Sequence, residues 1–323
     1  MKKGAEITSK KQRLPQINET EAKYSPMLNG NATNKVTKIS EKKNPARLDA
    51  YTGAATFTDS DFSLIIQKYT QLSCGFRTST KKLLDALTIR LSEQNHYKGG
   101  GEPNLNAVIS LEKYMSLCGK PLTKSSIDKT RKIVKEDLEI LFNMSIDFSD
   151  KINGKTAHFT QMRILQAIGM KNGDIAVTFS TQLANYLINS YIMQYPIALF
   201  RLDTRNANVY SMGKKLALHA SIENNRKRNT FDIISVKSLM QDAPEIPSFE
   251  EVMNADRHLE LRIITPFEKT LNLLMENNII FEWHYCNAKK EVLTDEQLKK
   301  MDYKVFIKLY ITFTMSNYPS NVR

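Results

Sequence analysis

Apolar residues recur at helical spacing in three consecutive segments of the chain, 79–94, 110–119 and 121–141. The first segment carries a stripe of leucines, the second is short and is ended by Gly119 and Pro121, and the third carries a longer apolar stripe. A short helix, a tight turn and a longer helix are typical of a helix-turn-helix, in which the second helix reads DNA. The pattern therefore predicts a reading helix over 121–141.

The spacing of apolar residues changes from helical to alternating directly after this helix. Residues 144–150 alternate between apolar and polar, and the Asn-Gly pair at 153–154 predicts a hairpin turn. Residues 155–170 are predicted to return as one strand, and 175–180 to close a small antiparallel sheet after a turn at 171–174. A helix-turn-helix that is followed by such a hairpin is a winged helix.

The same order of elements is repeated in the second half of the chain, although no close sequence repeat is present. An insert at 240–257 separates the two helices of this second unit, and the odd-numbered positions 305–313 of its last strand are apolar and should face the core. The predicted elements are a linking helix over 181–192, long helices over 204–225 and 257–278, a short helix over 235–244, and wing strands over 279–286 and 303–315. The sequence therefore predicts an α+β fold with two tandem winged-helix domains.

Pro266 lies in the middle of the second long helix. Proline lacks the backbone N–H and its ring collides with the preceding turn, so propensity alone would end the helix at Thr265. The apolar stripe continues across the proline, through Ile264, Phe267 and Leu271. We therefore expect a helix that is continuous but kinked.

Charge indicates the kind of partner. The chain has 323 residues, 41% of them hydrophobic and 25% charged, with a formal net charge of +12 and a pI of about 9.4. Such a balance favours a polyanionic partner, with nucleic acid ahead of a membrane. No apolar run reaches the roughly 18 residues that span a bilayer, and the N-terminus lacks the apolar segment of a secretory signal. Three separated cysteines without a CxxC pair indicate free thiols in a reducing cytoplasm.

The first 50 residues differ in composition from the rest. They hold eleven Lys or Arg against five Asp or Glu, and Tyr24 is their one aromatic residue. The segment is too poor in apolar residues to fold alone, so residues 1–55 are predicted to be a disordered basic tail, and deletion of residues 1–50 should leave the fold intact. Such a tail either only keeps the protein soluble or tethers it to DNA. The predicted domains are then 56–194 and 195–323.

The first reading helix has an unusual order of charges. Its basic and hydroxyl residues come first and its acids come later, whereas the helix dipole favours the opposite order in an isolated helix. The order suits a helix whose N-terminal end touches phosphates in a DNA groove, and the alternative is a solvated charged face. The candidate DNA-binding residues of this helix are Lys124, Ser125, Ser126, Lys129, Arg131 and Lys132.

In the second reading helix, Arg262, Thr265 and Lys269 share one face, and His258 lies a turn earlier. Arg262 is the best candidate for base reading, because arginine can donate two hydrogen bonds to guanine. The alternative is an ion pair of Arg262 with a neighbouring glutamate. A basic loop before this helix either contacts phosphate or is an ordinary surface loop, and its residues are Arg226, Lys227 and Arg228.

Motifs for catalysis are weak, and we expect no enzyme, no cofactor and no metal. The Gly-Lys-Thr at 154–156 lacks the glycine of a phosphate-binding loop five positions earlier. The five histidines are scattered and form no metal-binding set. Tyr210 with Lys214 could suggest a DNA-nicking tyrosine, but the paired histidines of such enzymes are absent, so Tyr210 is interpreted as a packing residue.

With these elements in order, the chain resembles the replication initiator proteins of iteron-type plasmids that replicate by the theta mode. The resemblance covers residues 57–323 and rests on the tandem winged-helix order, on Tyr195–His219 at the junction, and on Leu261–Asn278. In this last motif Arg262 and Pro266 match the family's arginine and mid-helix proline.

The resemblance implies a cytoplasmic bacterial protein, associated with a plasmid or the nucleoid, without catalytic residues. It implies a protein that binds repeated double-stranded origin DNA as a monomer in equilibrium with a homodimer, and that represses its own gene as the dimer. It also implies opening of an A·T-rich segment and recruitment of the host helicase or initiator. Two other classes remain open, namely a winged-helix transcriptional regulator that leaves its operator closed and a rolling-circle DNA-nicking enzyme.

Overall fold

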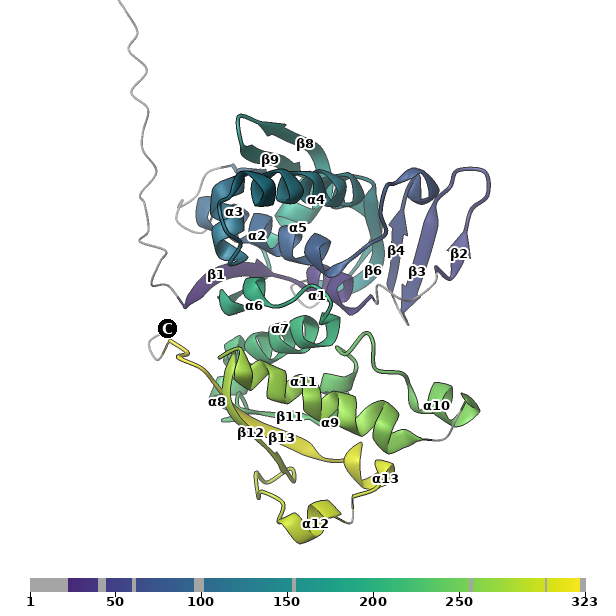
Figure 1. The fold of residues 1–323 in the computed structure, drawn as a ribbon, viewed down its shortest axis with the longest axis vertical. Helices are drawn as coiled ribbons and strands as arrows, with labels where there is room; N and C mark the ends of the chain where they lie inside the picture. The colour runs from purple at the N-terminus through teal and green to yellow at the C-terminus, as the bar shows by residue number, and fades with distance from the viewer. Residues whose placement is uncertain are drawn as a thin grey trace, which may run out of the picture.

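Two helix-and-sheet units lie one above the other in the computed structural model (Figure 1). Between them lie β1 (Tyr24–Asn29), α1 (Asn31–Lys38) and α6 (Ala198–Arg201). The structure describes residues 23–39, 45–59, 62–95, 102–152, 155–255, 258–299 and 301–319. Within these ranges the fold mixes helices and antiparallel sheets, as an α+β protein does.

The upper unit is a winged helix with one insertion. Its elements are α2 (Thr78–Asn95), β5 (Asn106–Ser110), α3 (Leu111–Leu117), α4 (Lys124–Phe142), β8 (Leu165–Lys171) and β9 (Asp174–Phe179). The sheet order is β5-β9-β8, so the first strand lies beside the third. The turn between α3 and α4 follows from Gly119, which takes a positive φ of 63° as helix-ending glycines do.

The lower unit repeats this topology. Its elements are α7 (Ala207–Ser221), β11 (Ile233–Ser235), α9 (Val236–Met240), the π-helical turn η2 (Glu260–Ile264), α11 (Thr265–Glu276), β12 (Ile280–Cys286) and β13 (Tyr310–Met315). The sheet order β11-β13-β12 again places the first strand beside the third. The predicted pair of tandem winged helices is therefore confirmed. Shorter helices join these elements: α5 (Thr181–Ile188), α6 (Ala198–Arg201), α8 (Glu223–Lys227), α10 (Phe249–Ala255), α12 (Asp295–Lys299) and α13 (Tyr303–Phe306).

The predicted wing of the first unit is wrong in part, because two of its strands belong to a separate five-stranded sheet. Its strands are β2 (Arg47–Leu48), β3 (Ala55–Asp59), β4 (Phe62–Ile66), β6 (Met144–Ile152) and β7 (Lys155–Arg163), in the order β2-β3-β4-β6-β7, and the short 3-10 turn η1 (Tyr69–Gln71) follows β4. The hairpin of β6 and β7 thus joins this sheet, and the wing is the hairpin of β8 and β9. The strand predicted over 155–170 is split at buried Ile164. The Ile164 N–H donates to the Met144 carbonyl in one sheet, and its carbonyl accepts from the Ser180 N–H in the other.

The prediction for the N-terminal segment is also wrong in part. The prediction of a disordered tail over 1–55 is wrong for the residues that form β1 (Tyr24–Asn29), α1 (Asn31–Lys38), β2 and the start of β3. β1 pairs antiparallel with β10 (Tyr191–Pro196), and Met27 and Val36 are fully buried. The segment has few apolar residues, but distant parts of the chain bury them. Residues 1–22 lie outside the described residues, and the domain boundary predicted at 194/195 falls within β10.

The second long helix is continuous through Pro266, as expected. The Thr265 N–H donates to the Glu260 carbonyl five residues earlier, which is the bonding of a π-helix. A π-turn widens the helix locally, so the carbonyl that the proline ring would meet is moved aside. Pro266 then lies in the first turn of α11, directly after the π-helical turn.

The strand predicted over 303–315 begins only at Tyr310. Residues 303–306 form α13 instead, because the Asp302 side chain accepts a 2.8 Å hydrogen bond from the Val305 N–H and caps a helix. Val305, expected in the core, is 43% exposed, and Phe306 is fully buried. The alternation holds from Ile311 onward, where Ile311 and Phe313 are buried.

Candidate nucleic-acid interface

The N-terminal half of α4 presents a basic face to solvent. Lys124, Ser125, Lys129 and Lys132 are exposed, and the opposite side of the helix is buried. Thr123 caps the helix by accepting a 3.4 Å hydrogen bond from the Ser126 N–H. Ammonium groups and hydroxyls next to a helix N-terminus can bind phosphates, because the dipole adds to their attraction. The structure thus places four of the six predicted residues of this helix on one accessible surface.

The other two predicted residues of α4 are less accessible. Ser126 and Arg131 are half-buried. The Arg131 guanidinium pairs with the Asp128 carboxylate at 2.7 Å, one turn earlier on the same helix. Part of the Arg131 charge is therefore compensated by the protein itself.

The acids in the second half of α4 hold the helix against α2. The Asp137 carboxylate accepts hydrogen bonds from Arg77 Nε at 2.9 Å and from Thr80 Oγ1 at 2.7 Å, and Glu136 Oε2 lies 2.9 Å from the Arg77 guanidinium. Burial raises the pKa of Asp137, and the charge of Arg77 opposes that rise. The late position of these acids, which is unfavourable for an isolated helix, is thus explained by a contact within the fold.

The second reading helix also exposes the predicted residues. Arg262, Thr265 and Lys269 are exposed along η2 and α11, and His258 is exposed just before η2. The other side of this helix is buried in the lower unit, through Ile263, Ile264, Phe267, Leu271 and Leu274.

Sequence reasoning missed Leu261, which is 66% exposed beside Arg262. An exposed leucine on a reading helix can contact the methyl group of thymine. Its position outside the apolar stripe was the signal available in the sequence.

The basic residues after α7 do not form the expected loop, because Arg226 and Lys227 lie in the short helix α8 and Arg228 follows its end. Arg226 Nε donates to the Ala220 carbonyl at 2.9 Å, and its guanidinium lies 4.9 Å from the centre of the Tyr318 ring. Arg226 therefore packs the C-terminal segment onto the second unit. Lys227 pairs with Glu223 at 2.6 Å on the surface, and Arg228 is exposed. Of the three residues, Arg228 is the one whose position best fits contact with phosphate.

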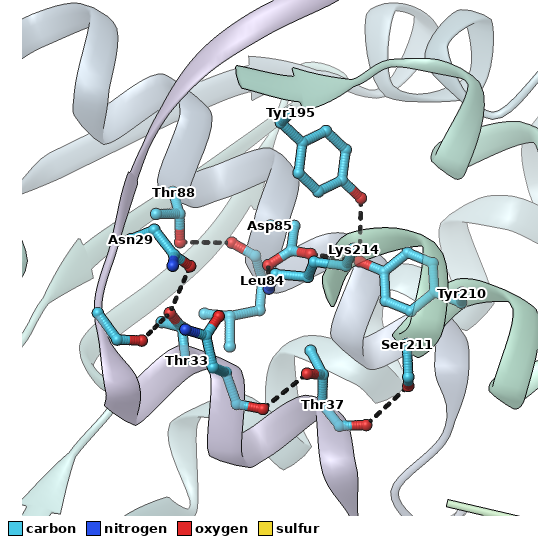
Figure 2. A network of polar contacts seen from close by, with 12 residues as sticks. Asn29, Thr33, Thr37, Leu84, Asp85, Thr88, Tyr195, Tyr210, Ser211 and Lys214 are labelled. Atoms are coloured by element: carbon cyan, nitrogen blue, oxygen red, sulfur yellow. Dashed lines mark hydrogen bonds and ion pairs between the residues drawn. The ribbon is translucent and has the colours of Figure 1, made fainter. Parts of the chain in front are cut away.

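A buried ion pair joins the two units. Lys214 Nζ of α7 lies 2.7 Å from Asp85 Oδ1 of α2, and both side chains are 2% exposed or less. The Tyr210 hydroxyl donates to the same carboxylate and lies 3.1 Å from the Tyr195 hydroxyl (Figure 2). Burial and the Asp85 charge raise the pKa of Tyr210 well above its usual value, so its hydroxyl stays a donor. This arrangement makes Tyr210 a packing residue that solvent does not reach.

The described parts of the chain contain no group of three His, Cys, Asp or Glu side chains placed to hold a metal ion. No helix in these parts is long and apolar enough to cross a membrane. Asn153 of the predicted hairpin turn and Gly154 of the Gly-Lys-Thr motif lie outside the described residues.

The fold and the exposed basic helices define a class of protein with two winged helices on one chain, each presenting an exposed basic helix. Among solved structures, the chain is similar to a Pi initiator protein in complex with iteron DNA, with 12% sequence identity and a TM-score of 0.53. The alignment covers 92% of this chain and 98% of that protein. At this identity the likeness shows a common fold.

Domains 2 and 3 of RctB align less closely. Two structures of these domains have TM-scores of 0.41, with 10% and 8% identity, and cover 89% and 88% of this chain and 99% and 96% of their own. No protein-family model matches the sequence, and no curated protein matches it.

Proposed function

We propose that this chain is a plasmid replication initiator that binds repeated origin DNA sequence-specifically and acts by binding rather than by catalysis. The observation that carries the proposal is the combination of two exposed basic reading helices, α4 and η2–α11, with the fold of a protein that was solved on iteron DNA. The net charge of +12 supports a polyanionic partner.

The proposed mechanism uses two DNA-binding winged helices on one chain. Once α4 occupies one major groove, the second unit is held at a high effective concentration near the next groove, about 34 Å away. Contacts that form only with bent or underwound DNA then lower the cost of opening an adjacent A·T-rich segment. In this proposal the protein works in the bacterial cytoplasm, recruits the host helicase or initiator, and represses its own gene as a homodimer in equilibrium with the monomer.

The DNA beside the gene provides the test. The purified full chain should protect several direct repeats next to an A·T-rich stretch in a footprint, and unpaired bases in that stretch should become reactive to permanganate. Protection of a single inverted repeat without reactive bases would instead identify a transcriptional regulator. Metal-dependent nicking of supercoiled DNA would identify a processing enzyme, which the burial of Tyr210 does not favour.

A further inference from the structure

The contact between the two units is built from equivalent parts of each unit. β1 and β10 pair antiparallel, from Tyr24 opposite Pro196 to Asn29 opposite Tyr191. Each strand lies against the first helix of its own unit, β1 on α2 and β10 on α7. A two-stranded ribbon with one helix on each strand therefore connects the units.

The same hydrogen bond fixes each strand to its helix. The Leu28 N–H of β1 donates to Ser92 Oγ of α2 at 2.6 Å, and the Gln194 N–H of β10 donates to Ser221 Oγ of α7 at 3.0 Å. Each serine hydroxyl in turn donates at 2.7 Å to the carbonyl four residues earlier in its helix. Ser92 and Ser221 thus occupy equivalent positions in the two helices.

The equivalence continues along both helices. Asp85 lies seven residues before Ser92, and Lys214 lies seven residues before Ser221, so the two members of the buried ion pair are equivalent and 129 positions apart. Lys82 and Ser211 are also 129 positions apart, so they occupy equivalent positions in the two helices. The two helices therefore meet in register around the ion pair.

The first helix of each unit also forms hydrogen bonds with the segment that follows the strand of the other unit. Thus α2 bonds the segment after β10, and α7 bonds the segment after β1. Lys82 Nζ of α2 donates to the Phe200 carbonyl at 3.1 Å and to the Leu202 carbonyl, at and after the end of α6. Ser211 Oγ of α7 donates to the Thr37 carbonyl of α1 at 2.9 Å (Figure 2). We call the six residues Lys82, Asp85, Ser92, Lys214, Ser211 and Ser221 the joint.

The joint is connected to both reading helices. The hydrogen bonds to Asp137 fix α4 on α2. On the other side, α11 packs closely on α7 at Gly213, where an added Cβ would lie 2.7 Å from Leu274 Cδ2. Close contacts therefore connect the four helices in the order α4, α2, α7 and α11.

A buried ion pair contributes little net stability, because the loss of hydration offsets much of the attraction, but it favours one arrangement of its partners over others. In this fold, sliding α2 along α7 would leave the Asp85 and Lys214 charges buried without a partner.

From these contacts we infer that the joint holds α4 and α11 at one separation and one relative rotation. Each DNA repeat then has two half-sequences, one bound by each winged helix. Asp85 and Lys214 are positioning residues that restrict binding to repeats with one spacing between these half-sequences. The inference rests on the proposed function. One inserted base pair moves the second half-sequence by about 3.4 Å and rotates it by roughly 34° around the DNA axis. A rigid joint cannot follow this movement, whereas a loose one can.

The first test measures spacing selectivity. In the double variant Asp85→Asn/Lys214→Met both charges are removed and the side-chain volumes are nearly kept. Binding of the full chain is measured on the natural repeat and on repeats with one base pair inserted or removed between the half-sequences. The wild type should lose about 100-fold in affinity on the altered repeats, because simultaneous engagement is lost, and the double variant less than about 10-fold. An unchanged ratio in the double variant overturns the inference.

A matched control removes an ion pair within one unit. Lys290 Nζ and Asp232 Oδ1 lie 2.6 Å apart in the second unit. The variant Asp232→Asn/Lys290→Met should keep the spacing ratio of the wild type. If the control variant changes the ratio as much as the joint variant, the effect is general destabilisation and the inference fails.

The second test needs no DNA and so separates the joint from the proposed function. Spin labels are placed at Lys135→Cys on α4 and Glu276→Cys at the end of α11, with the three native cysteines replaced by alanine. The wild-type joint should give one narrow distance distribution, and the double variant a broader one. If the double variant does not fold, Ser211→Ala removes one bond of the joint and should broaden the distribution by less. Equal widths in wild type and variant refute a rigid joint, whereas a wild type that binds no repeat refutes only the proposed function.

Discussion

The guanidinium of Arg77, the residue directly before α2, donates to the buried Asp137 carboxylate of α4 at 2.9 Å, and this contact helps to fix α4 on its scaffold. The same helix keeps Lys129 and Lys132 exposed at its other end. The contact of Asp137 within the fold explains the late acids of α4, and the exposed bases at its start suit the proposed contact with DNA phosphates.

We expect Arg262→Ala to reduce binding to the specific repeat by about 1–3 kcal/mol and to relax discrimination at one base pair, as loss of a two-bond contact with a base does. The variant is titrated on the repeat and on a scrambled duplex of equal length. Equal losses on both duplexes would show that Arg262 contacts only the backbone.

Lys129→Ala and Lys132→Ala should weaken binding to specific and scrambled DNA alike. Each variant should lower the slope of log affinity against log salt by about one phosphate contact. Arg226→Ala is the matched control, because Arg226 packs on Tyr318. It should reduce the melting temperature and leave the salt slope unchanged. If Arg226→Ala changes the salt slope as much as the two lysine variants do, Arg226 contacts DNA phosphate after all.

Removal of residues 1–22 and of residues 1–39 should have different effects. The shorter deletion leaves every described contact in place. The longer one removes β1 and α1 with the buried side chains of Met27, Val36 and Ile39, each stabilising the fold by about 1.5–3 kcal/mol. Thermal unfolding should therefore show a large loss of stability for the longer deletion alone. Similar melting temperatures for the two truncated chains would contradict the packing of β1.

Stability should fall as the pH is lowered below about 6.5, the ordinary pKa of histidine. Burial lowers the pKa of His219; Lys215 adds to this effect, and hydrogen bonds to the Thr230 and Ile233 carbonyls oppose it. The folded state therefore favours the neutral ring, and the unfolded state takes up a proton first as the pH falls. Urea unfolding between pH 7.5 and 5 should show this loss, and His219→Gln should reduce it. An identical pH dependence in the variant would assign the loss to other groups.

Tyr210→Phe should retain origin binding and plasmid replication, because the lost hydroxyl bonds only Asp85 and Tyr195 inside the protein. The expected cost is about 1 kcal/mol of stability, seen in thermal unfolding. A variant that binds normally but fails to replicate the plasmid would instead indicate covalent chemistry at this tyrosine.

The sequence by itself determined the long helices of both units, their exposed faces and the repeated order of helix-turn-helix and wing. The stripes of α4 and α11 are visible within each helix, since helical periodicity depends only on residues three and four positions apart. The repeated winged-helix order followed from these local patterns, and so did the exposed positions of Lys129 and Arg262.

Only the tertiary structure decided which elements meet. β1 looked like part of a polar tail, yet Tyr24 pairs with Pro196 far along the chain. The hairpin of β6 and β7 has an ordinary strand pattern, and its membership of the five-stranded sheet depends on β4. The pairing of Asp85 with Lys214, 129 positions apart, had no local signal. Strand pairing and buried ion pairs depend on partners that are distant in sequence, and local periodicity does not specify those partners.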